Sequence, residues 1–184
     1  MPDTTTTATA TPPATHAHIR WMIRRDLHEV LAIEHSSFPH PWSEPDFLHA
    51  LRQRNCIGMV AHSTDGLESI LGFMVYNLYP RHIEVLDFAV HPAHRRQGIG
   101  RQMVDKLVSK LSRHRRTRLL ITVPETWLGQ QLFFRDMGFL ATDVMREACM
   151  ATGEDVYLME YELGGGPDEA CEGISRTRIP GGRP

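Results

Sequence analysis

One segment in the middle of the chain, HPAHRRQGIGRQMV (residues 91–104), constrains its fold more than any other. It joins an apolar run that alternates like a strand (82–90) to a run whose apolar residues repeat with helical spacing (98–111). Gly98 and Gly100 stand at the start of that helix, where glycine loses more backbone entropy than any other residue. A strand, a glycine-rich turn and a helix start in this order predict a backbone that passes close to a bound group.

The residue types around the two glycines predict a site for phosphate. The first amides of a helix have no partner within it, and the helix dipole adds roughly half a positive charge there. Glycine lets the backbone approach a pyrophosphate closely, and Arg95, Arg96 and Arg101 add positive charge. The spacing Arg95-x-x-Gly98-x-Gly100 is neither the GxGxxG of a dinucleotide fold nor the GK[ST] of a P-loop, so neither class is indicated.

The apolar pattern predicts one α/β domain over residues 18–163. Strands are expected over 18–24, 56–62, 69–79, 82–90, 118–123, 139–146 and 156–163. Helices are expected from Asp26, from a cap at Ser43, over 98–111, and over 126–137 with Gly138 as the C-terminal cap. Asp26 with Glu29, and Ser43 with Asp46, are predicted to form capping boxes. Short turns between strands favour antiparallel pairs, and helices after strands favour a mixed sheet.

Composition limits the classes of function. Residues 1–17 and 164–184 have little to bury and are predicted to be disordered tails. The net charge of −2 indicates no nucleic-acid partner, and the lack of an apolar run of about 18 residues indicates no membrane span. Cys56, Cys149 and Cys171 are scattered and odd in number, which favours a reducing compartment, the cytoplasm. His91 and His94 alone are too few ligands for a metal, and the oligomeric state is not indicated.

The loop at 95–100 resembles the coenzyme A pyrophosphate loop of the GNAT acetyltransferases, whose signature is [Gln/Arg]-x-x-Gly-x-[Gly/Ala]. It follows the strand LDFAVHP and opens the helix GRQMVDKLV, and a helix ending in FFRDMGF comes later, in the family's order over 18–163. Segments 33–51 and 145–163 are similar to the RimI-type protein N-terminal acetyltransferases. The resemblance implies the α/β (α+β) GNAT fold: a mixed, mostly antiparallel sheet of about seven strands with four helices, splayed after the fourth strand.

The resemblance also implies an N-acetyltransferase that moves acetyl from acetyl-CoA to an amine, with a protein N-terminal α-amine, for example that of a ribosomal protein, as the leading acceptor. The pyrophosphate is expected on the amides of residues 96–101, and the pantetheine is expected to add like a strand beside 88–90. The implied coenzyme-binding residues are Phe88, Ala89, Val90, Arg95, Arg96, Gln97, Gly98, Ile99, Gly100 and Arg101. Two alternatives stay open: an acetyltransferase for a small amine or polyamine, and a coenzyme-binding module without catalysis.

Acetyl transfer to an amine needs a base for the ammonium proton and hydrogen-bond donors at the thioester carbonyl. Glu84 is the leading candidate base, because the histone-acetylating branch of the fold carries its glutamate at this spacing from the loop, and Asp87 is the second candidate. The alternative for Glu84 is a solvent-facing position. Strict strand alternation would place Glu84 with Leu86 and Phe88 on one face, and Asp87 with Val85 on the other.

The sequence departs from the RimI pattern at three positions. The family's catalytic tyrosine falls on Phe134, its base glutamate on Thr122, and its coenzyme-contacting asparagine on Trp127. Without a phenol at position 134, either the thiolate leaves directly or another tyrosine donates a proton. The candidate donors are Tyr76, Tyr79 and Tyr157.

Overall fold

The computed structural model describes residues 15–64, 69–149 and 152–164. Most of both expected tails, Cys171 and the expected turn at 63–66 beyond Thr64 lie outside these residues. The described elements are β1 (Ala17–Trp21), η1 (Arg24–Asp26), α1 (Leu27–Ser37), α2 (Glu44–Leu51), β2 (Cys56–Ser63), β3 (Ile70–Leu78), β4 (His82–Val90), η2 (Pro92–His94), α3 (Ile99–Val108), β5 (Arg118–Pro124), α4 (Leu128–Asp136), β6 (Leu140–Met145) and β7 (Val156–Glu162).

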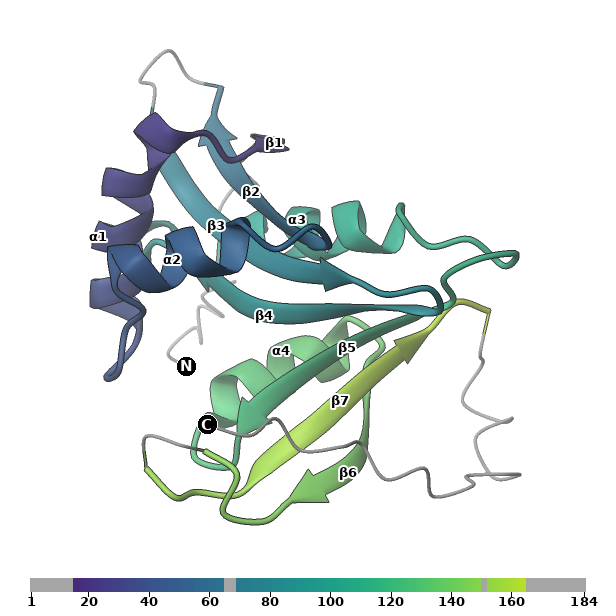
Figure 1. The fold of residues 1–184 in the computed structure, drawn as a ribbon. Helices are drawn as coiled ribbons and strands as arrows, with labels where there is room; N and C mark the ends of the chain where they lie inside the picture. The colour runs from purple at the N-terminus through teal and green to yellow at the C-terminus, as the bar shows by residue number, and fades with distance from the viewer. Residues whose placement is uncertain (1–14, 65–68, 150–151, 165–184) are drawn as a thin grey trace, which may run out of the picture.

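The strands form one seven-stranded sheet in the order β1-β2-β3-β4-β5-β7-β6 (Figure 1). Neighbouring strands are antiparallel except for β4 and β5, which are parallel. The predicted mixed, mostly antiparallel sheet is therefore confirmed, and so are the four α-helices that accompany it. No helix within the described ranges is long and apolar enough to cross a membrane.

The two faces of the sheet are covered unequally. We call the face on which α1 and α2 lie the front; their apolar residues pack there against β2, β3 and the end of β4. Helices α3 and α4 pack on the rear, where one core runs from β2 across to β7. In the part of the chain that the structure describes, no helix covers the front of β5 and β7 (Figure 1). The front is therefore closed over one half of the sheet and open over the other.

Local capping differs between the two front helices. At α2 the predicted box is present, because the Asp46 carboxylate accepts the Ser43 amide at 2.9 Å. At α1 the predicted box is wrong: Asp26 has helical backbone angles (φ −74°, ψ −19°) instead of the extended conformation that a capping residue needs. Its carboxylate pairs with Arg20 instead, at 2.6 and 2.8 Å, while Glu29 accepts the Ile70 amide at 2.9 Å.

The first strand begins at Ala17 and ends at Trp21, one residue earlier and three residues shorter at its end than predicted. The segment just before it lies against the glycine-rich loop. The Thr15 amide donates to the Gln97 carbonyl at 3.1 Å, and Gln102 donates to the Thr15 carbonyl at 2.7 Å. These contacts extend the described domain to residues that the sequence pattern had assigned to the N-terminal tail.

Strands β4 and β5 pair only where His82–Val85 run beside Arg118–Ile121. We call the fork the parts of the two strands beyond this pairing, residues 86–90 and 122–124 (Figure 1). The predicted splay after the fourth strand is therefore confirmed.

A bulge marks the start of the fork, because Val75 lies opposite Asp87 and Tyr76 opposite Val85, which leaves Leu86 without a partner on β3. One extra residue reverses the alternation of every side chain after it. The parity expected from the sequence is consequently wrong beyond Leu86. Asp87 joins Glu84 on the front face, and Phe88 packs against the rear core together with Val85.

Candidate active site

The glycine-rich loop has two residues in the left-handed region, Arg96 (φ 64°) and Gly98 (φ 80°). Gly98 is the residue before the first turn of α3, where glycine adopts a positive φ without strain. Backbone that includes left-handed residues at a helix start turns successive amides toward one concave point, which is the geometry of an anion site. Gly100 lies close to α4, where an added Cβ would come 3.2 Å from Cζ of Phe133, a tight contact.

The other loop residues have distinct positions. Arg95 is held by the Val90 carbonyl at 3.0 Å and by the Ser37 hydroxyl at 2.9 Å, so it ties the loop to β4 and α1. Arg96 and Arg101 are exposed, and their charge is available to a ligand. Ile99 is buried in the rear core, so only its backbone faces the loop. The Gln97 carbonyl accepts the Thr15 amide.

The backbone of β4 presents alternate amides to the fork. In an antiparallel pair, every second residue points its amide and carbonyl at the partner strand. The His91 amide donates to the Leu71 carbonyl at 2.8 Å, so Ala89 and Asp87, counted back by twos, also face β3. Phe88 and Val90 then face away from β3, toward the fork. Of the three β4 residues expected at the coenzyme, these two turn their amides toward the fork, whereas the backbone of Ala89 pairs with β3.

Glu84 lies on the front of β4, between Asn77 of β3 and Leu120 of β5, and is half-buried. The Tyr79 phenol donates a hydrogen bond to its carboxylate, and burial together with this negative neighbour raises the pKa of Tyr79. The ring of His82 stacks on Tyr79 with centroids 4.6 Å apart. Burial lowers the pKa of His82. A carboxylate, a phenol and an imidazole thus meet beside the paired end of β4 and β5.

The three candidate tyrosines are separated by their surroundings. Tyr76 is fully buried in the rear core, where burial raises its pKa to about 12 and its hydroxyl contacts the Met59 sulfur at 3.5 Å. Tyr157 packs against the same rear core. Tyr79 is therefore the candidate that lies with Glu84 on the front of the sheet.

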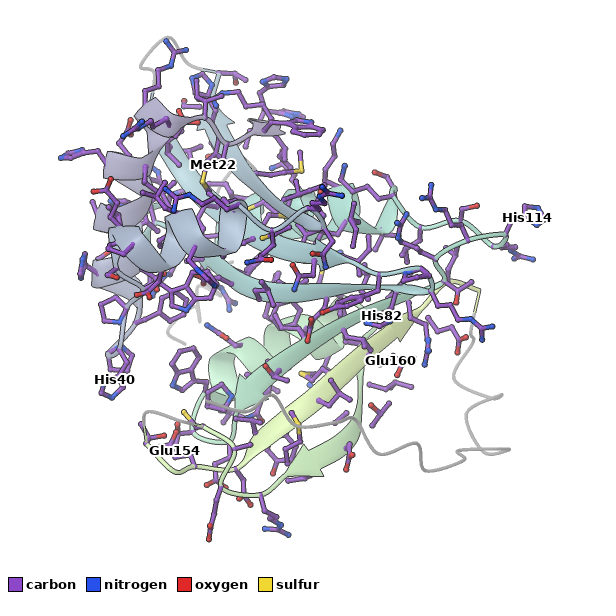
Figure 2. All side chains as sticks on the ribbon, viewed as in Figure 1. Met22, His40, His82, His114, Glu154 and Glu160 are labelled. Atoms are coloured by element: carbon purple, nitrogen blue, oxygen red, sulfur yellow. The ribbon has the colours of Figure 1, made fainter. Side chains whose placement is uncertain are left out.

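The uncovered front of β5 and β7 adds polar groups that the sequence had not singled out. Arg118 pairs with Glu160 at 3.2 Å, and Figure 2 shows Glu160 beside His82 where β4, β5 and β7 converge. Thr122, at the position of the RimI glutamate, is exposed on the same face. Glu160 could have been found from the sequence, because it alternates with Met159 and Tyr161 in a strand whose other face is apolar.

Aromatic packing accounts for two of the departures from the RimI pattern. Phe134 is buried and makes edge contacts with Phe88 at 5.7 Å and Phe139 at 5.2 Å. Trp127 precedes α4 and stacks on Phe38, which follows α1, with centroids 5.4 Å apart and planes 19° apart. This stack joins the front helical layer to the far side of the fork.

A second pair of acidic groups lies under α1. Glu34 and Asp87 are only 2% and 8% exposed, and their carboxyl groups lie within hydrogen-bonding reach of one another. The Trp42 amide donates to Glu34 Oε1 at 2.7 Å, and the Phe88 amide donates to Asp87. Burial and then the neighbouring Glu34 raise the pKa of Asp87 to about 8, and burial raises the pKa of Glu34.

Glu34 was missed at the sequence level, although a signal for it exists. It lies four residues after Val30 and seven after Leu27, on the apolar stripe of α1, so its carboxylate had to be buried. Within the described residues, no three His, Cys, Asp or Glu side chains converge to hold a metal ion. His91 instead accepts the Ala93 amide at 3.2 Å.

Comparisons with known proteins agree with this architecture. The Acetyltransferase (GNAT) family matches residues 27–139. A putative ribosomal protein bS18-alanine N-acetyltransferase of Bacillus subtilis is 23% identical over 145 residues, which cover 79% of this chain and 95% of the relative.

Solved structures share the fold. The ribosomal-protein-S18-alanine N-acetyltransferase of Escherichia coli superposes with a TM-score of 0.70 at 19% identity, over 84% of this chain and 98% of its own. Arabidopsis thaliana NAA60, solved with a bisubstrate analogue, gives 0.70 at 17% identity, over 82% of this chain and all (100%) of its own. Because the family match spans more than half of the chain and includes both the bulged strand and the left-handed loop, this protein belongs to the GNAT family of acetyltransferases.

Proposed function

We propose that this acetyltransferase transfers the acetyl group of acetyl-CoA to the α-amine at the N-terminus of a protein. The observation that carries the proposal is that two sets of backbone amides lie at the start of α3 and along the unpaired edge of β4. The left-handed loop before α3 turns its amides to one point, and the Phe88 and Val90 amides face the fork. The pyrophosphate would bind at residues 96–101, and the thioester carbonyl would accept the Phe88 amide.

We assign the base to Glu84. It is the half-buried carboxylate on the front of β4 next to the fork, and Tyr79 orients it through a hydrogen bond. Glu84 takes the proton of the acceptor ammonium, directly or through one water, and the neutral amine then attacks the thioester carbonyl. The thiolate departs and takes up a proton, for which Tyr79 is the candidate donor among the tyrosines of this face.

The acceptor is proposed to approach over the open front of β5 and β7. Glu84 and Glu160 outnumber the one cation paired here, Arg118, and leave this face an excess of negative charge that suits an incoming ammonium group. Two relatives with ribosomal-protein-alanine acetyltransferase names support a protein N-terminus, and a ribosomal protein is the leading class of acceptor. The scattered cysteines support the cytoplasm as the place of action.

The test compares Glu84→Gln with Glu162→Gln, a carboxylate at the exposed end of β7. Thiol release is measured with acetyl-CoA and a panel of peptides with free α-amines, and with spermidine as a small amine. We expect Glu84→Gln to lower kcat by about a hundredfold or more at unchanged acetyl-CoA affinity, and Glu162→Gln to behave as the wild type.

Different outcomes would overturn different parts of the proposal. Equal rates for both variants would remove Glu84 as the base. Turnover of spermidine without turnover of any peptide would replace the protein acceptor with a small amine. Binding of acetyl-CoA without turnover of any amine would leave a coenzyme-binding module.

A further inference from the structure

The Glu34–Asp87 pair is the one buried carboxyl cluster of the described residues that the reaction sequence above does not use. Glu34 Oε2 and Asp87 Oδ2 are both buried, and neither has a hydrogen-bond donor in the described structure. Their side chains come from different elements, α1 and β4, and face each other across the interface of the front layer with the sheet. An ionised carboxylate can only accept hydrogen bonds, so two ionised groups could not satisfy each other.

A single proton shared between Glu34 and Asp87 supplies the hydrogen bond that two ionised carboxylates lack. When one group is protonated, it donates to the other, and both orphaned oxygens gain a partner. The remaining acceptor positions already have donors, because the Trp42 amide binds Glu34 and the Phe88 amide binds Asp87. The pair therefore carries one proton and one negative charge near neutral pH, and the two groups titrate as a unit.

Other titratable groups on the surrounding elements do not change this conclusion. Burial and the two carboxyl groups, together with their backbone donors, account for the shifted pKa values of both. Within the residues that the structure describes, none of the remaining titratable groups of the neighbouring elements contributes to those shifts. These groups are His28, Glu29 and His35 on α1, His40 between the helices, Glu44, Asp46 and His49 on α2, Cys56 and His62 on β2, Tyr76 on β3, His82 and Glu84 on β4, and His91, His94 and Arg95 around η2.

Asp87 is also connected to the expected reaction centre by one backbone group. Its carboxyl accepts the Phe88 amide, which is the group that faces the fork and is proposed to hold the acetyl carbonyl. The acetyl carbonyl and Asp87 therefore compete for the same donor. A charged carboxylate forms roughly twice as strong a hydrogen bond as a neutral acceptor, so the protonation of Asp87 decides how easily the amide is released.

We propose that Asp87 is a positioning residue for the acetyl donor: the proton that it shares with Glu34 weakens its hold on the Phe88 amide, so that this amide can bind the carbonyl of acetyl-CoA. The inference rests on the proposed role of Phe88 and adds Glu34 and Asp87 to the machinery of the same site. Loss of the shared proton would return the amide to Asp87 and place a second negative charge beside the carbonyl oxygen, where negative charge develops during transfer.

The proposal predicts how stability and binding depend on pH. The pKa of Asp87 rises from 3.8 to about 8 on folding, so in this range the folded chain holds a proton that the unfolded chain has lost. The stabilising contribution is complete below pH 3.8 and falls as the pH rises through about 8. In the same alkaline range, the preference for acetyl-CoA over free coenzyme A should fall, because only the acetyl form needs the Phe88 amide.

The decisive measurement is the ratio of the affinities for acetyl-CoA and coenzyme A, determined by calorimetry between pH 6.5 and 9. For the wild type we expect this ratio to fall by about fivefold, the worth of one hydrogen bond. Asp87→Asn cannot ionise, so its ratio should not depend on pH. Glu34→Gln removes the like charge and offers an amide donor to Asp87, so Asp87 should ionise earlier and the ratio should already be low at pH 6.5.

A wild-type ratio that does not change with pH would overturn the proposal, as would an Asp87→Asn variant that follows the wild-type curve. Chemical unfolding of the wild type at the same pH values supplies a second readout, because a purely structural ionised pair would not release a proton near pH 8. Failure to bind either coenzyme form at any pH would instead defeat the proposed coenzyme site. The unfolding curve would then still decide whether the proton is shared.

Discussion

Glu84 and Asp87 are three residues apart on one strand and face the same side of the sheet, yet their environments are opposite. Asp87 lies beneath α1, where it is 8% exposed and shares its hydrogen bonds with Glu34. Glu84 lies just before the fork, half-buried, with a tyrosine as its hydrogen-bond partner. The difference comes from what covers the strand, because the front helices pack over its end but not over β5 and β7. Burial beneath α1 leads Asp87 to share a proton with Glu34, whereas the less buried Glu84 keeps a carboxylate that an acceptor can reach.

The comparison extends to the two halves of the sheet. Over β2 to β4 both faces are packed, so side chains on the front contribute mainly to stability. Around the fork and β5, the front is open and β4 is no longer paired on the side facing β5, so groups there are available for binding and chemistry. Substitutions in the covered part should therefore change the free energy of unfolding, and substitutions at the fork or loop should change binding or rate.

The largest effect is expected from Phe47→Ala in the covered part. Phe47 is fully buried on α2 and makes edge contacts with Trp42 at 5.3 Å and Phe73 at 5.6 Å. Removing the ring should lower the free energy of unfolding by about 3–5 kcal/mol, measured by urea denaturation. Coenzyme affinity of the folded fraction should be unchanged. A large loss of affinity without loss of stability would break the comparison.

The second largest effect is expected in the glycine-rich loop before α3, at the open part of the molecule. Gly98→Val places a branched side chain at a left-handed position in the loop and should weaken acetyl-CoA binding by about 2–4 kcal/mol, because several charge-assisted amide contacts are lost. Calorimetry at low temperature measures it. The matched control is Gly138→Val, which introduces a side chain at a similar φ of 90° after α4. Equal affinity in the two variants would show that backbone strain, and not phosphate contact, is the cause.

The smallest effect is expected from Thr122→Val. Thr122 is exposed on the uncovered front of β5. The free energy of unfolding should change by no more than about 0.5 kcal/mol, since surface substitutions away from special features are nearly neutral. A loss of more than about 2 kcal/mol would mean that this face is covered in the folded protein and that the two halves are alike.

Most elements were predictable because local signals determine them. Alternating and helical spacings of apolar residues indicated the strands and helices, and Gly138 ended α4 in the left-handed conformation expected of it. The loop signature was equally local. Its glycines looked equivalent in the sequence, but Gly98 adopts a positive φ, whereas Gly100 lies close to Phe133, a residue of another helix.

The failures depend on contacts between neighbouring elements, which the pattern within a single element does not reveal. The capping box at Asp26 was wrong because Arg20 and the amide of Ile70 attract the two carboxylates, at 2.6 to 2.9 Å. The face predicted for Asp87 was wrong because a bulge against β3 adds a residue at Leu86. No local sequence pattern marks such a bulge.

The sequence by itself determined the order of the elements, the left-handed loop before α3 and membership of the acetyltransferase family, since each follows from short-range spacing and composition. Only the tertiary structure decided which carboxylate is open and which is buried, and which of three tyrosines meets Glu84. Exposure and proton sharing depend on the low-dielectric contact between α1 and β4, and such a contact exists only after the chain has folded.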